Sequence, residues 1–324
     1  MPRLIDDYDA LIVDADGVIY RGATAVPHAV DVLGAVSVPW CLLTNNAALP
    51  PSAIAQRVEQ LGLALSPSNV VTSPQGAVAY LREHGVPAGS PILIVGGPGI
   101  DEAVVEGGFL PFRDRSINPV AVIQGLGHDV GWRELTDAGY AISVGAIWVA
   151  TNMDASLPTE EGFALGNGAL VAAVQHAIGR GPDAVTGKPE PLLFQLAVER
   201  MRATRPLVLG DRIDTDIRGA NRAGMDSLLV LTGVAGVREL IELIDADPTA
   251  RPTFIAEDLR ALTGSAEEVR VDRGAQGSGP LSTVRRLLGL VWSDPSQTEA
   301  VRSDVRAAIE AWQGQRTPHE RNLD

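Results

Sequence analysis

The stretch Leu11-Ile12-Val13-Asp14-Ala15-Asp16-Gly17-Val18 places two carboxylates directly after an apolar run, one residue apart and just before a glycine. A continuous apolar run bounded by a turn is typical of a strand buried on both faces, as in a parallel sheet. Because successive side chains of a strand point to opposite faces of the sheet, Asp14 and Asp16 would tend to point to the same face. Two close acids repel each other and lose hydration, which favours a nearby cation or ligand. The alternative is a pair of ordinary turn aspartates ahead of a helix.

The composition is that of an acidic globular protein. Among the 324 residues, 45% are hydrophobic and 20% are charged, and the formal net charge is -14. The negative charge argues against binding to nucleic-acid phosphates or to anionic membrane surfaces, so we expect neither kind of partner. The sequence begins without the apolar stretch of a signal peptide and contains no uninterrupted 18-residue apolar segment, which predicts a cytoplasmic protein.

A single lysine, Lys188, stands among 26 basic residues. Lysine offers a compact point charge and arginine a planar fork, so the two are not interchangeable where one cation must fit between oxygen atoms. Chance can also leave one lysine in a chain. The observation makes Lys188 a candidate for a specific role and does not establish one.

Apolar strands alternate with helical segments along most of the chain, which predicts βαβ units and a parallel sheet. The strands that we expect in this sheet lie at 11–13, 38–46, 70–73, 206–210, 227–231 and 253–256. Further strands at 92–95, 120–125 and 146–152 indicate a second α/β unit. The segment 264–279 is typical of a linker. Two amphipathic helices are expected beyond it, which either pack on the core or bind a partner.

Three of the expected strands end in polar side chains. In an open α/β sheet, ligands bind outside the carboxyl ends of the strands. Clustered acids favour Mg²⁺, whereas a hydroxyl, turn amides and an ammonium group suit phosphate oxygens. An ionised carboxylate beside a metal-bound phosphoryl group is a competent nucleophile. The strand-end residues are Asp14 with Asp16, Thr44 with Asn45, and Asp211 with Asp216, and Lys188 precedes the last pair.

Four segments, in this order, resemble the motifs of the haloacid dehalogenase superfamily of phosphatases. They are Asp14-Ala15-Asp16-Gly17-Val18, Thr44-Asn45-Asn46, Gly187-Lys188-Pro189 and the run from Gly210 to Asp216. The segment between the second and third motifs is similar to the C2-type cap of the NagD, phosphoglycolate phosphatase and pyridoxal phosphatase branch. Within it, Thr151-Asn152-Met153-Asp154 and the run from Gly166 to Leu170 also resemble that branch. The resemblance covers about residues 8–262.

The resemblance implies an α/β fold, with a Rossmann-like doubly wound parallel sheet, an inserted α/β cap and a C-terminal helical extension. On this basis we expect a core formed by residues 1–82 and 182–263, with a C2-type cap at 83–181. Residues 264–324 would form the linker and the helical extension. The resemblance also allows a homodimer.

The resemblance assigns the chemistry to two of these acids. Asp14 would be the nucleophile that forms an aspartyl-phosphate intermediate. Asp16 would protonate the leaving alkoxide and then deprotonate the hydrolytic water. Thr44, the turn amide of Asn45 and Lys188 would hold the transferring phosphoryl group.

The remaining acids are expected at the metal. Asp211, a carboxylate oxygen of Asp14 and the backbone carbonyl of Asp16 would bind Mg²⁺. Asp216 would support the metal's water molecules and Lys188. Asp214 has no clear place in this scheme, because its neighbours already fill the acidic positions of the motif.

The substrate is expected to be a small phosphorylated metabolite. In the resembling branch a cap loop lies over the active site, and here that loop is Asp154-Ala155-Ser156-Leu157-Pro158, with Asp154 and Leu157 as candidate specificity residues. It has no aromatic or histidine side chain to stack on a ring, which favours glycerol 3-phosphate or 2-phosphoglycolate. The alternatives are a pyridoxal phosphate or nucleotide phosphatase, and a non-catalytic phosphoester-binding or scaffold protein. The presence of Asp16, the expected acid/base residue, favours hydrolysis over a non-catalytic scaffold protein.

Overall fold

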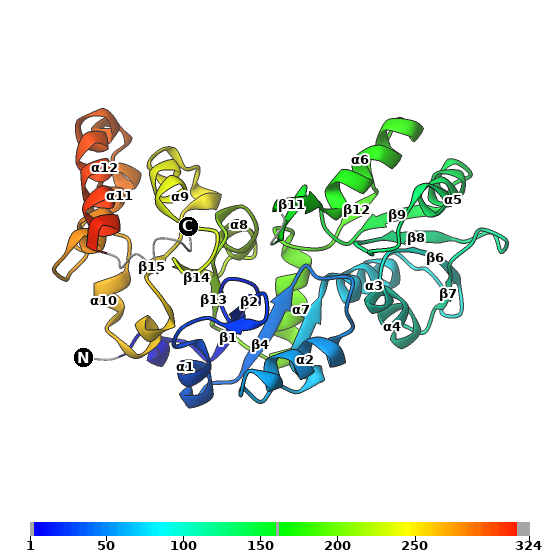
Figure 1. Cartoon of the computed structure of the whole chain (residues 1–324), viewed down its shortest axis with the longest axis horizontal. Helices are drawn as coiled ribbons and strands as arrows, with labels where there is room; N and C mark the ends of the chain where they lie inside the picture. Colours follow the sequence, from blue (N-terminus) through cyan, green and yellow to red (C-terminus); the bar gives the residue numbers. More distant parts are fainter. Residues whose placement is uncertain (1–2, 160–161, 316–324) are drawn as a thin grey trace. The chain divides into compact units, whose positions relative to one another are not determined.

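The computed structural model describes residues 3–159 and 162–315, and its contacts divide the chain into two compact units (Figure 1). The first unit comprises the residues up to Leu42, Val58–Ala64, and the residues from Ala197 onward. The second comprises Leu43–Arg57 and Leu65–Leu196. Each unit contains a parallel sheet.

A six-stranded parallel sheet is built around β1 (Ala10–Val13), which is fully buried and pairs in parallel with strands on both sides. Its strands are apolar and buried, as expected where helices cover both faces. The order is β15-β14-β13-β1-β4-β5. The other strands are β4 (Trp40–Thr44), β5 (Val70–Thr72), β13 (Pro206–Gly210), β14 (Asp226–Val230) and β15 (Phe254–Ala256).

Short helices connect these strands, and a two-stranded hairpin follows β1. The hairpin is β2 (Tyr20–Arg21) with β3 (Thr24–Ala25). The helices are α1 (Ala29–Ala35), α2 (Pro51–Gln60), α7 (Pro191–Met201), α8 (Arg218–Arg222) and α9 (Val237–Glu242), with 3-10 turns at Leu4–Asp7, Leu243–Asp245, Pro248–Ala250 and Leu259–Thr263. A single π-helical turn, η3 (Ile213–Ile217), precedes α8.

The C-terminal helices α11 (Pro280–Ser293) and α12 (Thr298–Gln315) lie side by side near α9 (Figure 1). A 3-10 turn, Pro295–Gln297, joins them. Their apolar faces are buried in one core with residues of β14, α9 and β15, for example Leu288 and Ile309 with Ile255. This supports packing on the core as the role of the amphipathic pattern.

The segment expected as a linker, 264–279, contains the short helix α10 (Ala266–Val269). Phe254 of β15 forms an isolated bridge with Arg270, and the backbone N–H of Val271 donates to the carbonyl of Thr253 at 3.0 Å. Part of this segment is therefore hydrogen-bonded along the edge strand, despite its glycine-rich and charged sequence.

The second unit has a five-stranded parallel sheet in the order β12-β9-β8-β6-β7. The strands are β6 (Pro91–Val95), β7 (Leu110–Phe112), β8 (Ala121–Gln124), β9 (Ile147–Ala150) and β12 (Ala184–Val185). Alternate residues face two separate cores: Ile92 and Ile94 pack with α3 (Ser73–Glu83) and α4 (Pro98–Glu106). Leu93 and Val95 pack with α5 (Trp132–Ser143) and α6 (Asn167–Ile178). A 3-10 turn at Pro67–Asn69 leads into β5.

The prediction of a loop over the whole of residues 154–158 is wrong for residues 156–158. Ser156–Thr159 form the strand β10, which pairs in antiparallel with β11 (Gly162–Leu165). Hydrogen bonding across the hairpin outweighs a sequence that is poor in strand-forming residues. Leu157 therefore lies on a strand, opposite Ala164.

The structure confirms the expected fold class, with parallel sheets flanked by helices and a helical C-terminal extension. Within the described residues, no helix is long and apolar enough to cross a membrane.

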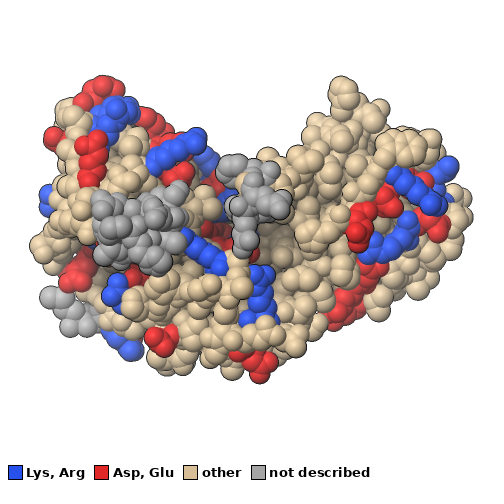
Figure 2. All heavy atoms as spheres, viewed as in Figure 1, with Lys and Arg blue, Asp and Glu red and all other residues tan. Residues whose placement is uncertain are grey.

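On the face in Figure 2, basic and acidic side chains lie close together. Several exposed groups pair, such as Arg302 with Asp245 at 2.8 Å. Exposed pairs of this kind contribute little to stability.

Candidate active site

Three carboxylates meet beyond the carboxyl ends of neighbouring parallel strands in the first unit. Asp14 follows β1, Asp211 follows β13, and Asp216 lies in η3. One oxygen of each lies within 4.8 Å of the others, and within residues 3–159 and 162–315 these three form a group that could hold a metal ion. Asp211 and Asp216 are each only 1% exposed. Three of the four strand-end acids, Asp14, Asp211 and Asp216, therefore lie together, whereas Asp16 does not belong to the group.

The Asp211 carboxylate is enclosed by backbone. The backbone N–H of Val234 donates to its Oδ2 at 2.6 Å. A Cβ atom added to Gly17 would lie 2.3 Å from the same oxygen, and one added to Gly233 would lie 1.8 Å from it. Gly17 also has a φ of +83°, which favours glycine. Only glycine at these two positions leaves room for the carboxylate.

Asp216 is fixed by a different local feature. It lies in the π-helical turn η3, where the backbone N–H of Arg212 donates to its Oδ2 at 3.1 Å. A Cβ atom on Gly210 would lie 2.2 Å from the Asp216 Cβ. Single π-turns are frequent at functional sites. The glycine that ends β13 therefore allows Asp216 to approach the strand end.

The donor set fits a hard divalent cation. Two carboxylates about 5 Å apart repel each other by about 3 kcal/mol at an effective dielectric constant near 20. A divalent cation with oxygen ligands removes this repulsion, and few protein ligands plus water suit Mg²⁺. Backbone packing around Asp211 gives the cluster a fixed geometry, since neither Gly17 nor Gly233 leaves space for large displacements.

The other two acids of these motifs lie elsewhere. Asp16 is exposed, and its carboxylate is not part of the three-carboxylate group within the described residues. Strand alternation does not apply to the pair, because β1 ends at Val13 and both acids lie in the following turn. Asp214 is exposed and pairs with Arg212 at 2.6 Å, which explains its lack of a place in the metal scheme.

In the second unit, the Asn45 side chain bonds two other predicted site residues, Lys188 and Asp154. Its Oδ1 accepts from the backbone N–H of Lys188 at 2.7 Å, and its Nδ2 donates to the Lys188 carbonyl at 3.0 Å. The same Nδ2 lies 3.2 Å from Oδ2 of Asp154. Lys188 is 5% exposed. Asn45 therefore fixes the backbone of Lys188 and reaches Asp154.

Thr44 ends β4 and is buried, and its Oγ1 accepts from the backbone N–H of Asn46 at 3.1 Å. The Asn45 carbonyl accepts from Ser73 Oγ at 2.8 Å and from Asn152 Nδ2 at 2.9 Å. These bonds hold the turn after β4 in one conformation.

The polar motifs of the inserted segment support the same turn and the β10–β11 hairpin. Asn167 Nδ2 donates to the Asn152 carbonyl at 2.7 Å, and the backbone N–H of Gly168 donates to the Asp154 carbonyl at 2.9 Å. A Cβ on Gly187 would lie 2.3 Å from the Thr151 carbonyl oxygen. Leu157 is half-buried and belongs to none of these bonds.

Sequence reasoning missed the segment that follows β14. Thr232 Oγ1 donates to the Gly17 carbonyl at 2.7 Å, and Arg21 Nη2 donates to the Gly233 carbonyl at 3.2 Å. With the Val234 N–H, this segment forms one wall of the acid cluster. The available signal was a glycine three residues beyond the carboxyl end of a strand of the same parallel sheet.

Two family models match the chain, and each covers part of it. Residues 11–110 match the haloacid dehalogenase-like hydrolase model. Residues 185–262 match a second model, described as HAD-hydrolase-like. The two matches contain Asp14, Thr44, Lys188, Asp211 and Asp216.

Phosphatases of this type are similar over most of the chain. D-glycerol 3-phosphate phosphatase from Mycobacterium tuberculosis is 36% identical, over 98% of this chain and 98% of that protein. Acid sugar phosphatase from Staphylococcus haemolyticus is 30% identical over 81% of this chain and 98% of that protein. A crystal structure of glycerol phosphate phosphatase from Mycobacterium tuberculosis, in complex with magnesium, has a TM-score of 0.85 at 37% identity and covers 90% of this chain and 93% of its own. This chain therefore belongs to the haloacid dehalogenase-like hydrolases and is a phosphoric monoester hydrolase.

Proposed function

We propose that this chain is a Mg²⁺-dependent phosphatase that hydrolyses glycerol 3-phosphate. The observation that carries the proposal is the group formed by Asp14, Asp211 and Asp216, which suits a divalent cation beside a carboxylate nucleophile. The substrate rests on the near full-length similarity to a D-glycerol 3-phosphate phosphatase. Asp154, which Asn45 holds, adds a hydrogen-bond acceptor suited to a small hydroxylated leaving group.

In the proposed reaction, a carboxylate oxygen of Asp14 attacks phosphorus while the bond to the ester oxygen breaks. Asp16 gives its proton to the departing glycerol oxygen. Asp16 then takes a proton from water, which attacks the aspartyl-phosphate, releases inorganic phosphate and restores the Asp14 carboxylate. Thr44, the amide of Asn45 and Lys188 hold the phosphoryl oxygens. Fixed charges and donors at these oxygens supply most of the rate in phosphoryl transfer.

We propose that Asp14, Asp211 and the backbone carbonyl of Asp16 hold Mg²⁺, with Asp216 in support. The ion supplies charge neutralisation at the phosphoryl oxygens. We also propose the expected division into a core at 1–82 and 182–263, a cap at 83–181 and an extension at 264–324. A cytoplasmic location and a homodimer remain predictions from the sequence.

The test is phosphate release from a panel of phosphomonoesters, with and without Mg²⁺. We expect glycerol 3-phosphate to have the highest kcat/KM, followed by 2-phosphoglycolate, and both rates to depend on the metal. Faster turnover of pyridoxal 5′-phosphate or of nucleotides would contradict the substrate assignment. Binding of phosphomonoesters without any turnover would favour a scaffold protein instead.

Replacing Gly233 by alanine is expected to weaken Mg²⁺ binding by about 10-fold or more. The new Cβ would lie 1.8 Å from Asp211 Oδ2, so the carboxylate or the segment after β14 must move. Isothermal titration with Mg²⁺ measures the effect. Gly264→Ala is the matched control, because its nearest heavy atom would lie at 3.6 Å. Equal Mg²⁺ affinity in Gly233→Ala and wild type would show that this packing does not position the ligand.

Replacing Asn45 by alanine is expected to lower kcat/KM for glycerol 3-phosphate by about 100-fold. The substitution removes both side-chain bonds to the Lys188 backbone and the bond to Asp154. Steady-state phosphate release measures the loss, and Asn69→Ala, at an exposed position of the same unit, is the control. A kcat/KM within a factor of about two of wild type would refute a positioning role for this side chain.

A further inference from the structure

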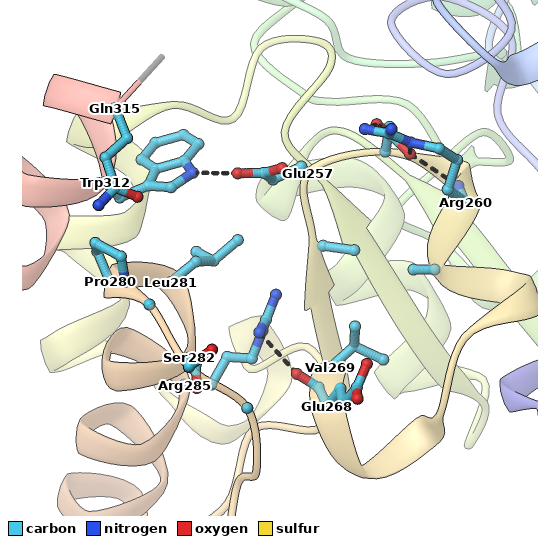
Figure 3. A pocket seen from close by; sticks show the side chains of 16 residues that line it. Glu257, Arg260, Glu268, Val269, Pro280, Leu281, Ser282, Arg285, Trp312 and Gln315 are labelled. Atoms are coloured by element: carbon cyan, nitrogen blue, oxygen red, sulfur yellow. Dashed lines mark hydrogen bonds and ion pairs between the residues drawn. The ribbon is translucent and has the colours of Figure 1, made fainter. Parts of the chain in front are cut away.

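A cavity of about 460 Å³ lies in the first unit, among β15, α10, the start of α11 and the end of α12 (Figure 3). Its volume is within the range of small-molecule sites. Buried apolar side chains, Leu281 and Trp312, form part of its wall. None of the lining residues belongs to the acid cluster or to the Asn45 network.

A buried cation points into this cavity. Arg285 is 8% exposed, and its guanidinium lies among the lining side chains in Figure 3. Its Nε donates to the Ile255 carbonyl and its Nη1 to the Glu268 carbonyl, both at 2.7 Å. Within the described residues, no hydrogen bond is made by Nη2 and no carboxylate lies within ion-pair distance.

The environment of Arg285 makes its positive charge costly. Burial lowers the pKa of Arg285 to about 10, although the charges of Glu257 and Glu268 act in the opposite direction. A buried guanidinium whose direct hydrogen bonds go to neutral carbonyls gains considerably from an anion in contact with it. The cavity therefore offers an anion a fixed cationic donor.

The start of α11 adds donors at the same place. Gly277, Ser278, Gly279 and Pro280 line the cavity, and no side chain of the described chain caps the helix at Gly279. The first backbone N–H groups of a helix have no intrahelical partner and favour negative charge. Side chains in a helix lean toward its amino end, which brings the Arg285 guanidinium and these amides to one cavity.

The acids of the wall limit the kind of ligand. Glu257, Asp258 and Glu268 line the cavity with Arg260 and Arg285, so carboxylates outnumber guanidinium groups. Asp258 is paired with Arg260 at 2.7 Å. Trp312 Nε1 donates to Glu257 Oε1 at 2.9 Å and orients this side chain at the cavity (Figure 3). A dianion would meet excess negative charge, whereas a ligand with one carboxylate and one ammonium group would match both signs.

We propose that this cavity binds a free α-amino acid as a zwitterion. Its carboxylate contacts Arg285 Nη2 and the amino end of α11. Its ammonium group contacts the Glu257 carboxylate, and its side chain lies against Leu281 and Trp312. The site is independent of the phosphatase reaction, since it shares no residue with the proposed catalytic groups.

The experiment is isothermal titration of the full chain with each of the common L-amino acids, in the absence of phosphoester and metal. We expect at least one to bind with a Kd below about 1 mM. Its methyl ester, which lacks the carboxylate charge, and its α-hydroxy acid, which lacks the ammonium group, should each bind at least about 10-fold more weakly. Inorganic phosphate is titrated as a further probe, and we expect weaker binding than for the amino acid.

Variants distinguish this site from others on the surface. Arg285→Gln should weaken binding by about 10-fold or more, whereas the exposed neighbour Arg286→Gln should bind as wild type does. Because Arg285 also bonds two carbonyls, Glu257→Gln provides a second test that keeps an acceptor for Trp312. The proposal is overturned if no amino acid binds up to about 10 mM. It is also overturned if phosphate binds more tightly, or if Glu257→Gln leaves the affinity unchanged.

Discussion

Replacing Asp14 by asparagine is expected to lower the rate of phosphate release from glycerol 3-phosphate by about 10,000-fold or more. The amide keeps the shape of the side chain and removes the charge that makes it a nucleophile. It also removes one of three carboxylates whose oxygens lie within 4.8 Å of one another. We therefore expect the variant to lose turnover and, in addition, to bind Mg²⁺ more weakly.

The measurements are phosphate release and Mg²⁺ titration, with thermal unfolding as a check on the fold. Removing one of three mutually repelling charges should leave the unfolding midpoint unchanged or raised in the absence of metal. Asp31→Asn, at an exposed position on α1, is the control for a change of one surface charge. Full, metal-independent activity in Asp14→Asn would show that the proposed nucleophile and metal site are both wrong.

The acid cluster could be predicted from sequence because parallel strands have a simple rule. Each strand was visible as an apolar run, and β13 spans the expected residues, Pro206–Gly210. Since β1 and β13 pair in parallel, Asp14 and Asp211 had to follow them at the same edge. Only the strand ends and the parallel direction of the strands were needed, and apolar runs that alternate with helices indicate both in the sequence.

The walls of the site could not be predicted in the same way, because they depend on distant backbone. Gly233 approaches the Asp211 carboxylate. Thr232 donates a hydrogen bond to the carbonyl of Gly17, which lies more than 200 residues earlier in the chain. The turn η3, which carries Asp216, departs from ordinary helical spacing, so periodicity does not reveal it. Close packing of this kind becomes visible only once the strands are assembled.

The hairpin was missed for a related reason. Its strand β10 has the sequence Ser156-Leu157-Pro158-Thr159, and β11 begins at Gly162. Proline and glycine are depleted in strands, and residues like these are read as a loop. Here the pairing with the partner strand decides the conformation.

The partner of the amphipathic helices α11 and α12 was likewise not predictable from sequence. Their pattern identified a buried face without identifying the surface that covers it.

Replacing Lys188 by arginine is expected to lower kcat/KM by about 100-fold or more, although the positive charge is kept. Lys188 is 5% exposed, and its backbone is held on both sides by Asn45. The compact ammonium group offers a point charge, and the larger planar guanidinium would not occupy the same place between oxygen atoms. The chain uses arginine at its 25 other basic positions, so arginine itself is well tolerated elsewhere.

Two readouts separate this effect from damage to the metal site. An ammonium group has no lone pair to offer a metal ion, so Lys188 is not a Mg²⁺ ligand, and Mg²⁺ affinity should remain that of wild type while turnover falls. Arg133→Lys, at an exposed position on α5, makes the reverse exchange in the same unit and should leave kcat/KM unchanged. If Lys188→Arg kept full activity, a general positive charge would suffice at this position. If it instead lost Mg²⁺ binding together with activity, Lys188 would act through the metal site and not through the phosphoryl group.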